Sequence, residues 1–320
     1  MEQIKASTIF ELSDSAPPRP IVKFKSSPKF IKTCQSMMPK QILHECLGAS
    51  FFSPSEAGLT YVDLDILRMK SAYLEGWKVK RLSVKVDNCI VDASIFLRPI
   101  YENTGRWVLI SLGLGDFYER IFSSANIQNL LISLQANCLL FNYPGVGCST
   151  GSPSRSGMIA SYHAMLRYLE ENIQAKEIIG YGHSLGASVQ AEALLNFTLS
   201  NNIKYCFIKD RGFANLRTVV EHQMGSAVAQ LIDILGWKFS SVESSLKLEA
   251  PELIIQTVDD EGKFIDDGQI PANATLGQAL FPNDAGETNR KRLLKVTQKH
   301  NEPMTDLAPL VCEVNQLLKL

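Results

Sequence analysis

The pattern Gly-x-Ser-x-Gly, which can place a reactive serine on a tight turn, occurs twice in the chain. The second copy, Gly182-His183-Ser184-Leu185-Gly186, lies directly between a predicted strand and a predicted helix. So sharp a turn needs glycine on both sides and exposes the serine hydroxyl, while the following helix directs N–H groups toward a developing negative charge. We therefore predict that Ser184 is a nucleophile and that Gly182 and Gly186 permit the turn.

The first copy of the pattern contains Ser149 and lacks this context. It lies several residues after a predicted strand that ends near Tyr143, and it continues into Ser152-Pro153 instead of a helix. A bare match is a weak signal, because a chain with 20 glycines produces such patterns by chance. We predict that Ser149 is a loop residue.

A serine hydroxyl needs a general base, and the base needs an acid that orients it. His300 is the only histidine after residue 222, and it follows the predicted strand 292–298. We assign it as the base. Several aspartates that follow predicted strands are candidates for the acid: Asp210, Asp259, Asp260, Asp266 and Asp267. We favour Asp267, which lies on a loop just before a predicted helix, and keep Asp260, nearer its strand, as the alternative. Asp210 could also serve as a helix cap.

Two backbone N–H groups are expected to stabilise the oxyanion that such chemistry produces. One belongs to Leu185, directly after the nucleophile. The other is expected from Leu114 in the turn Gly113-Leu114-Gly115, because the two glycines allow the backbone to approach the reacting atoms. The third glycine of a dinucleotide-binding pattern is missing, which disfavours a nucleotide cofactor.

The elements around these residues predict an α/β fold with a mostly parallel central sheet and helices on both faces. A hairpin with an Asp87-Asn88 turn comes first. Short apolar segments then alternate with helical segments. The apolar segments, which we expect to be strands, lie at 107–113, 137–145, 176–182, 205–210, 251–258 and 291–300. The helical segments are expected near 116–134, 155–173, 187–200, 214–235, 272–280 and 306–319. The segment between Asp210 and Pro251 is short, which predicts a small cap or none.

Composition narrows the class of protein. The chain of 320 residues is 45% hydrophobic and 20% charged with a net charge of −1, which argues against a disordered protein and against nucleic acid as a partner. Seven cysteines without a Cys-x-x-Cys pair argue against a disulfide framework and a structural metal site. The first residues do not resemble a secretory signal, and no apolar run reaches membrane-spanning length. We expect a cytoplasmic, reducing location, with export by a specialised system left open.

We predict two regions, a partly helical extension over residues 1–76 and a catalytic domain over residues 77–320. Helices are expected between residues 30 and 48 and at 61–74. The stretch 19–32 carries five cations and no acid, which is a solvated basic face or a weak contact surface for a membrane. Oligomeric state is not indicated.

The chain resembles the α/β-hydrolase superfamily over about residues 77–320, in motifs around the candidate site residues. The matching pieces are LISLGLG, NYPGVGCSTGSP, GYGHSLGASVQ, DGQIP and KHNEP, in family order. The segments DRGFANL and ILGWKFSSVESSLKLEAPELIIQ further resemble a poorly characterised branch from intracellular bacteria, some of whose members are host-directed effectors. The loop that carries the candidate acids is longer than is usual in the superfamily.

The resemblance implies a serine hydrolase that cleaves an ester, thioester or related acyl bond of a small or lipid substrate. Ser184 would attack the carbonyl, His300 would transfer the proton and Asp267 would orient His300, with no metal or organic cofactor. The competing hypothesis is a non-catalytic interaction protein, or a host-directed effector, on the same scaffold.

Overall fold

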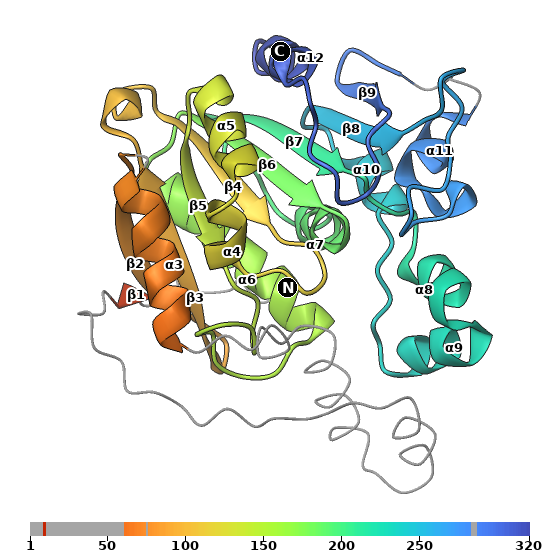
Figure 1. Ribbon diagram of the computed structural model, residues 1–320, viewed down its shortest axis with the longest axis horizontal. Helices are drawn as coiled ribbons and strands as arrows, with labels where there is room; N and C mark the ends of the chain where they lie inside the picture. The colour runs from red at the N-terminus through yellow and green to blue at the C-terminus, as the bar shows by residue number, and fades with distance from the viewer. Residues whose placement is uncertain (1–8, 11–60, 75, 283–286) are drawn as a thin grey trace, which may run out of the picture.

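The computed structural model describes residues 9–10, 61–74, 76–282 and 287–320 (Figure 1). The basic stretch 19–32 and the helices expected between residues 30 and 48 lie outside the described residues, so membrane contact through that stretch stays a prediction. In the described part of the chain, no helix has the length and apolar character needed to cross a membrane.

The described strands form one sheet in the order β1-β2-β3-β5-β4-β6-β7-β8-β9. Their bounds are β1 Ile9–Phe10, β2 Lys78–Val86, β3 Cys89–Leu97, β4 Arg106–Ser111, β5 Asn137–Phe141, β6 Glu177–His183, β7 Lys204–Asp210, β8 Glu252–Thr257 and β9 Lys291–Val296. The strands from β5 to β9 in this order are parallel, and β1, β2 and β3 continue the sheet in antiparallel pairs. The expected α/β class and the hairpin at Asp87-Asn88 are confirmed.

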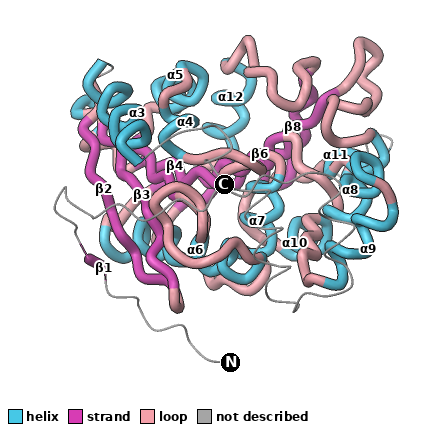
Figure 2. Tube along the Cα trace, turned by 60° about the horizontal axis from the view of Figure 1, so that its bottom comes forward, coloured by secondary structure: helices cyan, strands magenta, loops and turns pink. Residues whose placement is uncertain are grey.

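Helices cover both faces of this sheet, which explains why its central strands are buried along most of their length. Every residue of β5 and of β8 is buried, whereas β2, nearer the edge, has exposed positions. One face carries α3 (Tyr61–Leu74), α4 (Tyr118–Phe122), α5 (Ala125–Leu134) and α12 (Ala308–Leu317) (Figure 2). The other carries α6 (Arg155–Arg167), α7 (Leu185–Leu194) and α10 (Val242–Lys247).

Two of the predicted helices are interrupted. The segment expected at 116–134 forms α4 and α5, because Ser124 accepts a hydrogen bond from the N–H of Asn126 and starts a new helix. The segment expected at 214–235 forms α8 (Leu216–Met224) and α9 (Ser226–Ile234), which Gly225 separates at a φ of 89°. These two helices pack as a hairpin that projects beside the sheet (Figure 1) and forms a small cap.

Helix α3, which we placed in the extension, packs on the core. Leu64 is buried, and the guanidinium of Arg68 lies 2.6 Å from Glu119 of α4 and donates to the hydroxyl of Tyr118 at 2.6 Å. These contacts show that α3 packs in the same core as the residues after 76. A domain boundary at residue 76 stays a prediction.

Parallel strands end at the same edge of a sheet, and this places the candidate residues together. His183 at the end of β6 is in register with Asp210 at the end of β7. The loops after β8 and β9 carry Asp267 and His300 to this edge, where the main chain N–H of His300 donates to the carbonyl of Asp267 at 2.9 Å.

Candidate active site

Ser184 lies on a strained turn between β6 and α7. Its φ of 54° and ψ of −118° are uncommon for a residue with a side chain. Within the described chain its hydroxyl makes no capping hydrogen bond to α7, although Ser184 occupies the N-cap position. The turn therefore presents the hydroxyl to the surroundings, as a nucleophile requires.

The two glycines of this turn are required by space. A Cβ atom on Gly182 would lie 2.7 Å from the Cα of Ala187, and one on Gly186 would lie 2.1 Å from the carbonyl oxygen of Ser111. Both contacts involve backbone, so neither can be relieved by rotating a side chain. The helix α7 therefore packs against β4 and β6 at a distance that only glycine permits.

We expect Gly186→Ala to lower the free energy of unfolding by about 3 kcal/mol or more, because the new methyl group must displace backbone in a packed core. Chemical denaturation of purified variants measures this. Gly236→Ala is the control: Gly236 has a φ of 81° but open space around its Cβ position, so only the backbone cost of about 1 kcal/mol is expected. Equal losses in the two variants would contradict the packing argument.

Asp267 and His300 are hydrogen-bonded to each other. The Nδ1 of His300 lies 2.8 Å from Oδ2 of Asp267, and both residues are buried. The other carboxylate oxygen of Asp267 accepts from the N–H groups of Gln269 at 3.0 Å and Ile270 at 2.8 Å. Burial by itself raises the pKa of Asp267, but these hydrogen bonds and His300 outweigh it and lower the pKa. An Nδ1–H that donates to Asp267 leaves Nε2 of His300 as an acceptor.

The other candidate acids lie elsewhere. Asp260 is exposed in the turn after β8, and Asp259 accepts hydrogen bonds from the N–H groups of Glu261 and Lys263 within that turn. Asp266 lies 3.3 Å from His222 of α8. Asp210 is buried in an ion pair with Arg211. Of the aspartates considered, Asp267 is the one that the structure brings to the His300 ring.

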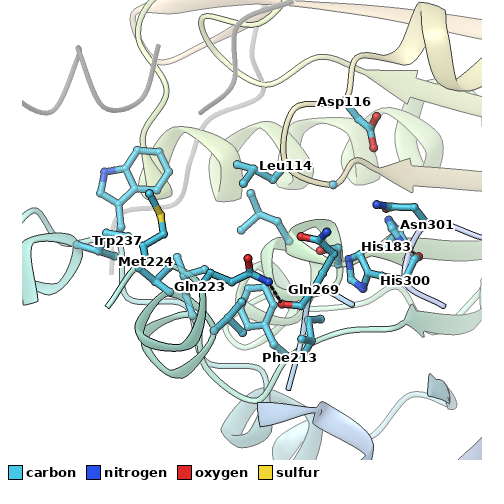
Figure 3. Close-up of a pocket in the computed structure, with 18 of the residues that line it drawn as sticks. Leu114, Asp116, His183, Phe213, Gln223, Met224, Trp237, Gln269, His300 and Asn301 are labelled. Carbon is cyan, nitrogen blue, oxygen red and sulfur yellow. Dashed lines mark hydrogen bonds between the residues drawn. The ribbon is translucent and has the colours of Figure 1, made fainter. Parts of the chain in front are cut away.

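An apolar cavity of about 320 Å³ opens beside Ser184 and His300. Its wall opposite the sheet comes mainly from the cap: Leu216, Val219, Val220, Gln223 and Met224 on α8, Ile232 on α9, and Leu235 and Trp237 after it. In Figure 3, Trp237 and Met224 lie at one end of the cavity, and His183, His300 and Asn301 lie at the other. The cavity is suited to an apolar group attached to the atom that Ser184 would attack.

Leu114 and Leu185, whose N–H groups we predicted as oxyanion donors, both line this cavity together with Ser184. Leu114 lies in the turn after β4, and it is about half exposed. A Cβ atom added to Gly113 of the same turn would lie 3.3 Å from side-chain atoms of Asp116 and His183, so a larger residue would crowd them. The oxyanion role of the two N–H groups stays a prediction.

Ser149 of the first Gly-x-Ser-x-Gly copy lies in a buried part of the loop after β5. Its hydroxyl accepts a hydrogen bond from the N–H of Asp92 at 2.8 Å and donates to the carbonyl of Asn142 at 2.8 Å. The hydroxyl thus joins this loop to β3. This arrangement agrees with the loop role expected for Ser149.

Metal-binding potential within the described residues is confined to Asp92, Glu119 and Cys148, whose ligand atoms lie within 4.8 Å of one another. The guanidinium of Arg68 lies 2.6 Å from Glu119 and 3.6 Å from Asp92 and supplies positive charge there. Burial raises the pKa of Cys148 to about 11, which keeps its thiol protonated and makes it a poor ligand. The cluster therefore fits a structural ion pair better than a metal.

Sequence reasoning missed two parts of the site. The first is the apolar cap wall, whose residues on α8 and α9 become a cavity lining only after the hairpin folds over the sheet edge. The second is Arg211, which contacts the loop of His300. A signal was present, because the pair Asp210-Arg211 stands at the end of a predicted strand, where functional side chains gather in parallel sheets.

The sheet order and the turn at Ser184 define the α/β-hydrolase fold. Comparison with known proteins agrees. An α/β-hydrolase from Vibrio vulnificus is 17% identical, with a TM-score of 0.63 over 95% of this chain and 98% of that chain. The Pyrococcus furiosus esterase Pf2001 is 15% identical, with a TM-score of 0.58 over 78% of this chain and 92% of that chain.

The chain belongs to the family described as Chlamydia CHLPS protein (DUF818), whose model matches residues 32–314. A curated relative, the lysophosphatidylserine lipase ABHD12 of Danio rerio, is 23% identical over 197 residues. That match covers 49% of this chain and 52% of the relative, so the chain spans about half the length of the curated relative it matches.

Proposed function

We propose that this protein is a serine hydrolase that cleaves a carboxylic ester or thioester with an apolar acyl group. The observation that carries the proposal is the hydrogen bond between His300 and Asp267, 2.8 Å long, at the wall of the same cavity that Ser184 lines. A nucleophile, a base and an orienting acid at one apolar cavity match what acyl transfer to water requires.

In the proposed reaction the hydroxyl of Ser184 attacks the acyl carbonyl while Nε2 of His300 accepts its proton. Asp267, whose lowered pKa keeps it ionised at neutral pH, stabilises the imidazolium that forms. The N–H groups of Leu114 and Leu185 stabilise the oxyanion, and each such donor typically contributes about 3–4 kcal/mol in the transition state. His300 then protonates the leaving group. In the second half of the reaction water attacks the acyl-enzyme while His300 accepts a proton from it, and His300 returns this proton to the Ser184 oxygen as the carboxylic acid leaves.

The cavity supports a substrate with one acyl chain. A methylene group takes about the volume of a water molecule, ~30 Å³, so a cavity of about 320 Å³ has room for a chain of about ten carbons. The curated relative is a lipase for lysophosphatidylserine, a lipid with one acyl chain, which is consistent with this. The direct test is hydrolysis of p-nitrophenyl esters of increasing length, compared with the Ser184→Ala variant.

We expect Trp237→Ala to shift the preferred acyl length upward, because Trp237 lies at the end of the cavity away from His300 (Figure 3). For esters longer than the wild-type optimum, kcat/KM should rise by up to about fourfold for each further methylene that the enlarged cavity buries. Phe197→Ala is the control, since Phe197 packs on Arg167 and His163 and does not line the cavity. An unchanged length profile in Trp237→Ala would contradict the assigned position of the chain.

A further inference from the structure

We propose that Arg211 is a positioning residue that holds the loop of His300 at a fixed position relative to the Ser184 turn. The proposal rests on the proposed function, because it assigns Arg211 a role that acts through His300. Arg211 does not line the cavity, so its effect on a reaction must be transmitted by its contacts with other residues.

The contacts of Arg211 lie on both sides of the base in the sequence. Its Nη1 donates to the carbonyl of Lys299 at 2.5 Å and to the carbonyl of Glu302 at 2.6 Å. His300 lies between these two residues, on the loop that leads from β9 to α12. Two hydrogen bonds from one nitrogen therefore fix the backbone that carries the His300 ring, while the ring itself stays free to face Asp267.

Asp210 fixes the guanidinium from the other side. The Nε and Nη2 of Arg211 donate to the two carboxylate oxygens of Asp210 at 2.8 and 2.9 Å, which is the paired geometry that arginine and a carboxylate prefer. The hydroxyl of Tyr181 on β6 donates to the same carboxylate at 2.5 Å. Although burial by itself raises the pKa of Asp210, the charge and hydrogen bonds of Arg211 lower it, so the pair is ionised.

The backbone of Asp210 also contacts the turn that carries Ser184. The carbonyl of Asp210 accepts a hydrogen bond from the N–H of Ser184 at 3.0 Å. Asp210 and Arg211 are consecutive residues, and together they connect the backbone of the Ser184 turn to the backbone around His300. A third connection runs in parallel, because Nε2 of His183 lies 3.0 Å from the carbonyl oxygen of His300.

The geometry of Arg211 suits positioning better than stability alone. A buried ion pair is weak evidence for stability, since apolar residues of similar volume often replace one without loss. An apolar side chain at this position, however, could not hold two carbonyl groups in fixed positions. Arg211 also adopts a φ of 46°, which is uncommon for a residue with a side chain.

The test measures turnover per active site in Arg211→Met and Arg211→Lys, using p-nitrophenyl esters. Active sites are counted as moles of folded protein, from the protein concentration and the folded fraction measured by circular dichroism. We expect kcat to fall about 10- to 100-fold in Arg211→Met with KM changed less than threefold, since small misplacements of catalytic groups cost this much. Arg211→Lys keeps a charge beside Asp210 but cannot bind both the carboxylate and two carbonyls, so about a tenfold fall is expected.

Arg106→Met is the matched control. Arg106 also donates to a carboxylate, Glu177 at 2.6 Å, and to a carbonyl, Leu134 at 2.9 Å, but it stands at the first residue of β4, the end of the sheet away from the site. Loss of this arginine should lower the melting temperature and leave kcat per active site near the wild-type value.

A double-mutant cycle shows whether Arg211 acts through His300. In a His300→Ala background, Arg211→Met should cause no further loss of residual activity, because the group that it positions is gone. Wild-type kcat per active site in Arg211→Lys, or an equal further loss in the His300→Ala background, would overturn the inference. If the wild-type protein itself shows no hydrolysis that depends on Ser184, the proposed function fails first, and the inference fails with it.

Discussion

Ser184→Ala is expected to lower kcat for ester hydrolysis by about 10⁵-fold or more and to abolish labelling by a fluorophosphonate. Removing the nucleophile of a serine hydrolase leaves only binding and oxyanion stabilisation, so the loss is that of the whole catalytic unit. Fold should be unaffected, because within the described chain the Ser184 hydroxyl makes no capping hydrogen bond to α7. Hydrolysis and gel-based labelling of the purified proteins measure both effects.

The chain supplies a matched control in the other Gly-x-Ser-x-Gly copy. Ser149→Ala removes a buried hydroxyl with two hydrogen bonds, so about 1–3 kcal/mol of stability should be lost. Labelling per folded molecule should nevertheless equal that of the wild type, because Ser149 does not line the cavity. Persistent labelling of Ser184→Ala would refute the assignment of the nucleophile. Absence of labelling and of hydrolysis in the wild type would favour the interaction-protein hypothesis.

The second large effect is expected for the acid. Asp267→Asn should lower kcat by about 10⁴-fold, because a neutral amide neither fixes the His300 tautomer nor stabilises the imidazolium. The variant should still fold, since an amide oxygen can accept the hydrogen bonds from the N–H groups of Gln269 and Ile270 that organise the loop. Steady-state kinetics with thermal melting as a folding check measure the two properties separately.

Asp260→Asn distinguishes the two candidate acids. Asp260 is exposed in the turn after β8, so its replacement should change kcat less than twofold. Equal losses in the two variants would mean that the loop as a whole, and not the carboxylate of Asp267, is needed. A large loss in Asp260→Asn alone would reverse the assignment that the hydrogen bond to His300 supports.

Local patterns in the sequence were enough to predict the fold class. Alternating apolar strands and helices predicted the parallel sheet, and the range 61–74 predicted for α3 equals the range observed. The same patterns overestimated helix length at 116–134 and 214–235. Ser124 and Gly225 interrupt those segments through local hydrogen bonding and backbone conformation, which outweigh the helical periodicity of the neighbouring apolar residues.

What the sequence determined by itself was the turn at Ser184, because its glycines, strand and helix are neighbours in the chain and their sterics are local. It also limited the predicted base to His300, because His300 is the only histidine after residue 222. Only the tertiary structure showed that Asp267, and not Asp260, contacts the His300 ring. It also brought α8 and α9 over the sheet edge as a cavity wall, and it brought Arg211 into contact with the His300 loop. These relations join segments far apart in sequence, and they depend on which loops meet where parallel strands end.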